Sequence, residues 1–79
     1  MKVKLTYFAV LREQRGLSHE EIETDCVTAS DLYTDLKERH GFSLDSNLVT
    51  VALNGAFQPM ETPLSDGDEV VFIPPVAGG

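Results

Sequence analysis

The sequence has one cysteine, Cys26, among its 79 residues. One thiol cannot form a disulfide within the chain, so the fold does not require an oxidising compartment, and the cysteine pairs typical of zinc sites are missing. No basic residue neighbours Cys26 in the sequence, which favours a buried small residue over a reactive thiol.

Long apolar runs are missing as well. The longest strictly apolar run is the five residues from Tyr7 to Leu11, far short of the roughly 20 residues that a membrane-spanning helix needs. Lys2 and Lys4 interrupt the apolar positions near the N-terminus, so no signal-peptide core forms there. We therefore expect a cytoplasmic location and no membrane partner.

Basic residues are scarce. Six lysines and arginines stand against thirteen aspartates and glutamates, which gives a formal net charge of -7. A chain of this charge repels phosphate backbones, so we expect no nucleic-acid partner, and a basic protein partner is favoured. The remaining composition, 42% hydrophobic and 24% charged, is typical of one small globular domain.

Catalytic and metal-binding motifs are also absent from the sequence. The glycines are scattered and form no phosphate-binding loop, and His19 and His40 lie far apart. Asp66, Asp68 and Glu69 fall in one turn, but a calcium loop needs more oxygen ligands at a longer regular spacing. We expect no metal and no permanently bound cofactor.

The N-terminal half predicts two strands and two helices. Alternating apolar and polar residues favour a strand over 2–7, followed by a helix of one or two turns. An acidic segment over 18–25, poor in apolar residues, suits an edge strand. Thr28 is placed to cap a second helix with one apolar face, and Gly41 is placed to end it.

The C-terminal half predicts strands only. After a connection over 42–47, the segment 49–53 is strongly strand-forming, and Asn54-Gly55 is a strong hairpin signal. A short return strand over 56–58 is expected. The apolar segment 70–73, bounded by a turn and two prolines, predicts a buried strand.

This order of elements predicts an α+β chain with the β-grasp, ubiquitin-like fold. We expect a mixed sheet of four to five strands with one main helix packed on one face, and with the first and last strands parallel and adjacent. The predicted division is a β-grasp domain over 1–73 and a flexible Gly-Gly tail over 74–79.

The tail is the part of the sequence best suited to chemistry. Pro74 and Pro75 stiffen the exit from the last strand, while Gly78 and Gly79 lack side chains, so a partner can close around the backbone. The reactive group expected there is the α-carboxylate of Gly79. The alternative is a frayed terminus without function.

The chain resembles the MoaD family of ubiquitin-like sulfur carriers, the small subunits of molybdopterin synthase, over essentially its whole length. Four segments carry the resemblance. They are Tyr-Phe-Ala-Val-Leu-Arg-Glu at 7–13, Val-Ala-Leu-Asn-Gly at 51–55, Pro-Leu-Ser-Asp-Gly-Asp-Glu-Val at 63–70 and Phe-Ile-Pro-Pro-Val-Ala-Gly-Gly at 72–79.

The resemblance implies a sulfur-transfer role without catalytic groups on this chain. An E1-like adenylyltransferase would convert Gly79 to an acyl-adenylate, with AMP bound only transiently, and a sulfur donor protein would leave a thiocarboxylate there. The loaded tail would enter the large subunit, in a heterotetramer of two small and two large subunits, and give its sulfur to cyclic pyranopterin monophosphate.

Three other functions share parts of this pattern. The chain would be a sulfur carrier for thiazole formation or tRNA thiolation, a modifier conjugated to lysines through Gly79, or an interaction module without terminal chemistry. The Pro-Pro-Val-Ala-Gly-Gly ending favours the molybdopterin pathway.

A partner surface is predicted from the alternation along the strands. Phe8, Phe57 and Ile73 are expected on the sheet face that the helix leaves open, where exposed apolar groups mark an interface. The alternative for Phe57 is the core. Arg12 is a candidate charged contact or an ordinary solvated arginine. The remaining partner-binding candidates are the tail residues Pro74, Pro75, Val76 and Ala77.

Overall fold

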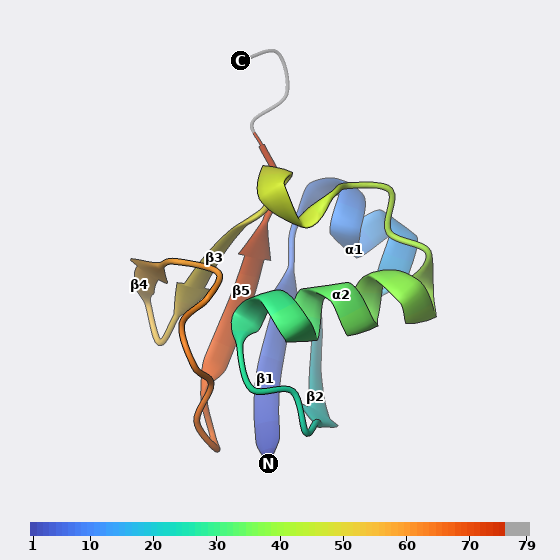
Figure 1. Cartoon of the computed structure of the whole chain (residues 1–79). Coiled ribbons are helices and arrows are strands. Elements are labelled where there is room, and N and C mark those ends of the chain that lie inside the picture. Colours follow the sequence, from blue (N-terminus) through green and yellow to red (C-terminus); the bar gives the residue numbers. More distant parts are fainter. Residues whose placement is uncertain (76–79) are drawn as a thin grey trace.

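The computed structural model describes residues 1–75 (Figure 1). In chain order the elements are β1 (Lys2–Tyr7), α1 (Ala9–Arg15), β2 (His19–Glu23), α2 (Ala29–His40), the 3-10 helix η1 (Ser46–Leu48), β3 (Thr50–Leu53), β4 (Ala56–Gln58) and β5 (Glu69–Ile73). Most of these elements match the predicted order of strands and helices.

The strands form one five-stranded sheet in the order β2-β1-β5-β3-β4. β1 and β5 are parallel, and every other neighbouring pair is antiparallel. α2 crosses one face of this sheet (Figure 1). The predicted β-grasp fold is therefore confirmed, including the pairing of the first and last strands and the place of the acidic strand β2 at an edge.

The core lies between α2 and the sheet. Side chains that alternate along β1 and β5 point toward the helix, as the period-two pattern predicts. The helix presents one apolar stripe to them, with residues three or four apart. The core members from these three elements are Val3, Leu5, Tyr7, Ala29, Leu32, Tyr33, Leu36, Val70 and Phe72.

Both predicted ends of α2 are confirmed. The side-chain oxygen of Thr28 accepts a hydrogen bond from the N–H of Asp31 at 3.1 Å, which satisfies one of the unpaired donors in the first turn. Gly41 adopts a left-handed conformation with φ of 70°, and its N–H donates to the carbonyl of Lys37. Gly41 thus ends the helix in a conformation that costs glycine little.

The connection after α2 is more structured than predicted. Phe42 is only 4% exposed, and its ring stacks on Tyr33 and meets the edge of Tyr7, each at a centroid distance of 5.9 Å. The 3-10 helix Ser46–Leu48 follows. The segment is too short for its sequence to show a helical periodicity. Its conformation depends on the burial of Phe42 and not on local propensity.

Three strand boundaries in the structure differ from the predicted ones. The edge strand His19–Glu23 is shorter than the predicted 18–25, while β3 begins at Thr50 and β5 begins at Glu69, each one residue away from the predicted start.

α1 buries Leu11 completely, so it contributes to the core although it is only seven residues long. Within the described residues 1–75, the helices are too short and too polar to cross a membrane.

Candidate functional site

The predicted reactive residues, Gly78 and Gly79, lie outside the described part of the chain. So do Val76 and Ala77, which were predicted to bind the partner. The structure does show where they are attached. β5 ends at Ile73, Pro74 is buried and Pro75 is exposed. The predicted tail begins at Pro74, yet Pro74 packs into the body of the domain, so its side chain offers a partner little surface.

The attachment point lies at the same end of the sheet as Phe8. β5 runs parallel to β1 with Tyr7 opposite Phe72, so both strands end together. Phe8 keeps extended dihedral angles, φ -123° and ψ 153°, and its side chain therefore lies on the side of the sheet opposite Tyr7. Phe8 is 47% exposed, so its ring is accessible to a partner.

The open face of the sheet carries a row of apolar side chains. In the strand registers, Val71 on β5 is opposite Ala52 on β3, and Ala52 is opposite Phe57 on β4. Opposed residues share a face, and this face is the one turned away from the buried Val70 and Phe72. Phe57 is 71% exposed and does not enter the core.

We call the surface formed by Phe8, Ala52, Phe57, Val71 and Ile73 the apolar strip. It runs from the edge strand β4 across the sheet to the end from which the chain leaves β5. Its four large or branched members, all but Ala52, are exposed or half-buried, which is unusual for side chains without a partner. The role of the strip in binding stays a prediction.

Sequence reasoning missed two members of the apolar strip, Ala52 and Val71. The signal was present in the run Val70–Ile73, because a strand that is apolar at every position must place half of its side chains on the second face. The sequence pattern predicts a buried strand there and assigns only Ile73 to the open face. In the structure only one side is covered, by α2.

The other half of the open face is charged. Lys4 on β1 lies between Glu21 on β2 and Glu69 on β5. Next to this row, the hydroxyl of Thr6 is 3.1 Å from Nδ1 of His19. These side chains line a shallow hollow of about 440 Å³. Carboxylates outnumber lysine there, so the flank of the apolar strip suits a basic partner surface.

Arg12 lies beside Phe8, as predicted. Its N–H donates to the carbonyl of Phe8 at 3.4 Å, in the first turn of α1, and its side chain is exposed. Arg12 takes no part in the salt bridges found among residues 1–75. The role of Arg12 as a contact to a partner stays a prediction.

A partly buried polar cluster holds the opposite end of α1. Both Nε and Nη2 of Arg15 donate to the carboxylate of Glu20 at 2.8 Å, and the hydroxyl of Tyr7 donates to the same carboxylate at 2.6 Å. The hydrogen bonds from Arg15 hold the pKa of Glu20 below its usual value. Burial and the nearby Glu20 carboxylate raise the pKa of Tyr7, so its hydroxyl stays protonated.

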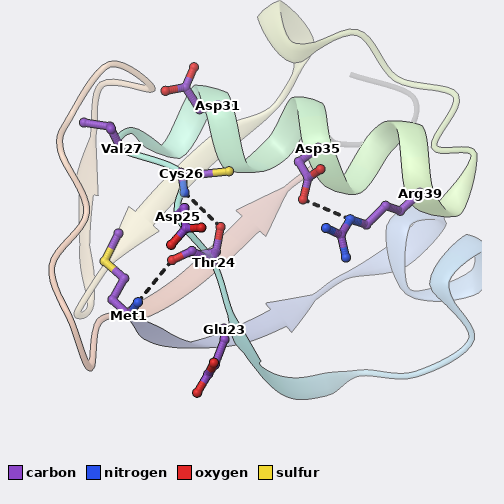
Figure 2. Close-up of a pocket in the computed structure, with 9 residues that line it drawn as sticks. All are labelled: Met1, Glu23, Thr24, Asp25, Cys26, Val27, Asp31, Asp35 and Arg39. Atoms are coloured by element: carbon purple, nitrogen blue, oxygen red, sulfur yellow. Dashed lines mark hydrogen bonds and ion pairs between the residues drawn. The ribbon is translucent and has the colours of Figure 1, made fainter.

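A groove of the domain lies away from the end of β5 (Figure 2). It measures about 570 Å³ and is lined by Met1, the end of β2 and one side of α2. Asp35 forms an ion pair with Arg39 at 3.1 Å there, and Cys26 packs against the core. Within residues 1–75 no three His, Cys, Asp or Glu side chains are arranged to hold a metal. The groove is remote from the end of β5 and does not join the candidate site.

The chain is similar in sequence to known proteins of the same length. The model of the ThiS family matches residues 5–79. The chain is 34% identical to the molybdopterin synthase sulfur carrier subunit of Escherichia coli, over 98% of this chain and 99% of that protein.

Solved structures agree with this comparison. The putative molybdopterin converting factor subunit 1 from Pyrococcus furiosus superimposes with a TM-score of 0.77 at 36% identity, over 95% of this chain and 98% of that one. A subunit of the complex of subunits 1 and 2 of the molybdopterin-converting factor from Helicobacter pylori gives a TM-score of 0.66 at 28% identity, with both chains covered completely.

Proposed function

The chain belongs to the ThiS family, and we propose that it is the sulfur carrier subunit of a molybdopterin synthase. The observation that carries this proposal is the full-length similarity to proteins of that name, one of which aligns with 100% of this chain, and the family match extends through Gly78 and Gly79. The fold supports the proposal because the central strand β5 delivers the chain to one end of the apolar strip.

The proposed chemistry takes place at the carboxylate of Gly79. A carboxylate is a poor acyl donor, so an E1-like enzyme first joins it to AMP from ATP and releases pyrophosphate. The terminal sulfur of a protein persulfide then attacks the acyl carbon and AMP leaves. A thiol of the donor reduces the resulting acyl disulfide, which leaves a thiocarboxylate on Gly79 and a disulfide on the donor.

The thiocarboxylate is the form that donates sulfur. Its sulfur attacks cyclic pyranopterin monophosphate in the large subunit, and hydrolysis of the resulting thioester returns Gly79 to a carboxylate. Two such transfers build the dithiolene of molybdopterin. In this proposal the large subunit supplies the substrate site and the acid–base groups, while this chain supplies the sulfur and its delivery.

The docking geometry follows from the end of β5. Because Pro74 is buried, five residues remain from Pro75 to Gly79, and a fully extended chain of that length spans roughly 16 Å at about 3.3 Å per residue. That length lets Gly79 enter a deep pocket of the large subunit while the apolar strip rests on its surface. We propose the cytoplasm as the location, and a heterotetramer of two carriers and two large subunits as the assembly.

The test is intact mass spectrometry followed by a transfer assay. Freshly isolated protein is expected to carry a fraction with one oxygen replaced by sulfur at the C-terminal residue. Carrier loaded chemically with a thiocarboxylate should yield molybdopterin when mixed with the purified large subunit and the precursor, and unloaded carrier should yield none. Loaded carrier that binds the large subunit but forms no product would refute the proposal. Lysine-linked conjugates of the chain would point instead to a protein modifier.

A further inference from the structure

The side chain of Phe8 does not stabilise the helix that follows it. It is the N-cap residue of α1, and its side chain makes no capping hydrogen bond. Serine, threonine, aspartate or asparagine at an N-cap would accept such a bond and stabilise the helix. A phenylalanine that is 47% exposed offers neither a cap nor much burial, so its orientation matters for something outside the domain.

The turn after Phe8 is strained. Ala9 has a φ of 50°, in the left-handed region that alanine rarely adopts. This turn redirects the chain from the extended Phe8 into α1. A strained backbone conformation persists only where the surrounding structure fixes the chain on both sides of it.

One carboxylate fixes both sides of this turn. Tyr7 precedes Phe8 and donates to Glu20 at 2.6 Å, while Arg15, the last residue of α1, donates to Glu20 twice at 2.8 Å. Glu20 lies on β2, so the segment from Phe8 to Gln14 forms a loop whose two ends are bound to a third element. The Arg15 and Glu20 side chains are only 25% and 15% exposed, so water competes weakly for these bonds.

A second contact holds α1 from another direction. The side-chain amide of Gln14 donates to the hydroxyl of Ser43 at 2.9 Å, and its carbonyl oxygen accepts from the N–H of Ser43 at 3.1 Å. Leu11 of the same helix is buried completely in the core. α1 is therefore fixed to the sheet, to the core and to the connection after α2, although a seven-residue helix is marginal by itself.

We propose that Glu20 is a positioning residue that acts through Phe8. By binding Tyr7 and Arg15 together, Glu20 holds the left-handed turn at Ala9, and the turn fixes Phe8 in the orientation in which it meets the partner. The identity of that partner, the large subunit, rests on the function proposed above. The orientation of Phe8 in the free chain does not.

The first experiment concerns the free chain. Backbone order parameters of residues 8–12 are measured by NMR relaxation in the wild type and in Glu20→Gln, which keeps the size of the side chain but removes its charge. The matched control is Asp35→Asn, which removes a carboxylate from the ion pair with Arg39 on α2. Order parameters should fall in Glu20→Gln alone. Unchanged values for residues 8–12 would overturn the proposal.

The second experiment is a double-mutant cycle on affinity for the large subunit. Glu20→Gln should weaken binding about three- to tenfold, because the partner must then order Phe8 itself. In a Phe8→Ala background the same change should weaken binding by less than about twofold, since nothing remains to be positioned. An equal loss in both backgrounds would overturn the proposal and leave Glu20 a purely structural residue.

If Glu20→Gln folds poorly, a second variant tests the same contact. Arg15→Met keeps the aliphatic stem of a partly exposed side chain and removes only its two bonds to Glu20. It should give the same pattern in both experiments. If wild-type carrier does not bind the large subunit at all, the proposed function fails, and the relaxation data alone decide whether Glu20 orders Phe8.

Discussion

Asn54 is tied to Asp68 across the two turns that meet at the end of β3. The side-chain amide of Asn54 donates to Oδ1 of Asp68 at 2.9 Å, and its side-chain oxygen accepts from the N–H of Glu69 at 2.9 Å. Asn54 has a φ of 52°, so it also supplies the left-handed turn of the hairpin. One residue thus joins the β3–β4 hairpin to the start of the central strand.

Replacing Asn54 should destabilise the whole domain. We expect Asn54→Ala to lower the free energy of unfolding by about 2–3 kcal/mol, since it loses two hydrogen bonds and places alanine in a left-handed conformation. Asn54→Gly loses the same bonds but tolerates the backbone, so it should cost about 1 kcal/mol less. Urea unfolding measures both. Equal losses would show that the backbone conformation contributes nothing.

A substitution of Thr28 should affect stability and leave sulfur transfer unchanged. Thr28→Ala should lower the free energy of unfolding by about 1 kcal/mol, because the N–H of Asp31 loses its acceptor. Sulfur transfer, measured at a temperature where the variant stays folded, should be unchanged because the cap is far from the apolar strip. Unaltered stability would mean that water replaces the cap without cost.

Phe57 offers the opposite test. Since its side chain is 71% exposed, Phe57→Ala should hardly change the melting temperature. Binding to the large subunit should weaken by about 2 kcal/mol, a common cost for truncating a central interface aromatic. Leu48→Ala is the control, because Leu48 is 50% exposed but lies on η1, outside the apolar strip. A Phe57→Ala carrier with normal affinity would remove Phe57 from the interface.

Stability should depend on pH through the Tyr7–Glu20 pair. The pKa of Glu20 is lowered in the folded state by Arg15, so its contribution is present above the unfolded pKa of about 4.3 and is lost on acidification. The pKa of Tyr7 is raised by burial, so its contribution is present below about pH 10 and is lost above it.

The measurement is urea unfolding across a pH series. Wild type should be most stable between about pH 6.5 and 10, because burial also lowers the pKa of His40, and the free energy of unfolding should fall on either side. Glu20→Gln should flatten the fall on the acid side, because glutamine has no proton to gain. An acid limb as steep in Glu20→Gln as in the wild type would assign it to other carboxylates.

The terminal glycines should separate docking from chemistry. Deleting Gly79, or adding one residue after it, should leave folding and most of the affinity for the large subunit intact, because the apolar strip is untouched. Sulfur transfer should be abolished, since misplacing the reacting carbon by even about 1 Å costs about 10²-fold. Gly78→Val should also load or transfer poorly, because its branched side chain would meet the walls of the partner's channel.

The assay for these tail variants is molybdopterin formation from its precursor with purified large subunit and carrier. Thr28→Ala serves as the control for general destabilisation. If the shortened or extended carrier works at the wild-type rate, the terminal-glycine mechanism is wrong and the interaction-module alternative gains support.

The sequence predicted those parts of the fold that local patterns determine. Thr28 and Gly41 mark the ends of α2 because caps depend on nearby backbone, and Asn54-Gly55 marks a hairpin for the same reason. Phe42 and the Glu20 cluster were not predicted. Their roles depend on partners far along the chain, and no spacing in the sequence indicates which residues the fold brings together.

The candidate site shows the same division. Alternation correctly placed Phe8 and Phe57 on the exposed side, because a strand has only two faces. It did not show that Pro74 would be buried or that Val71 would join the apolar strip, since both depend on which face α2 covers.

The central position of β5 has a consequence for the order of events in the cell. The strands β1 and β5 are the most distant in sequence, yet they pair, so the sheet cannot be completed until residues 69–73 are free to insert between β1 and β3. Phe8, Phe57 and Ile73 come together only at that moment. An activating enzyme that recognised the apolar strip would therefore consume ATP on folded chains alone, although the terminal glycine of an unfolded chain is chemically identical.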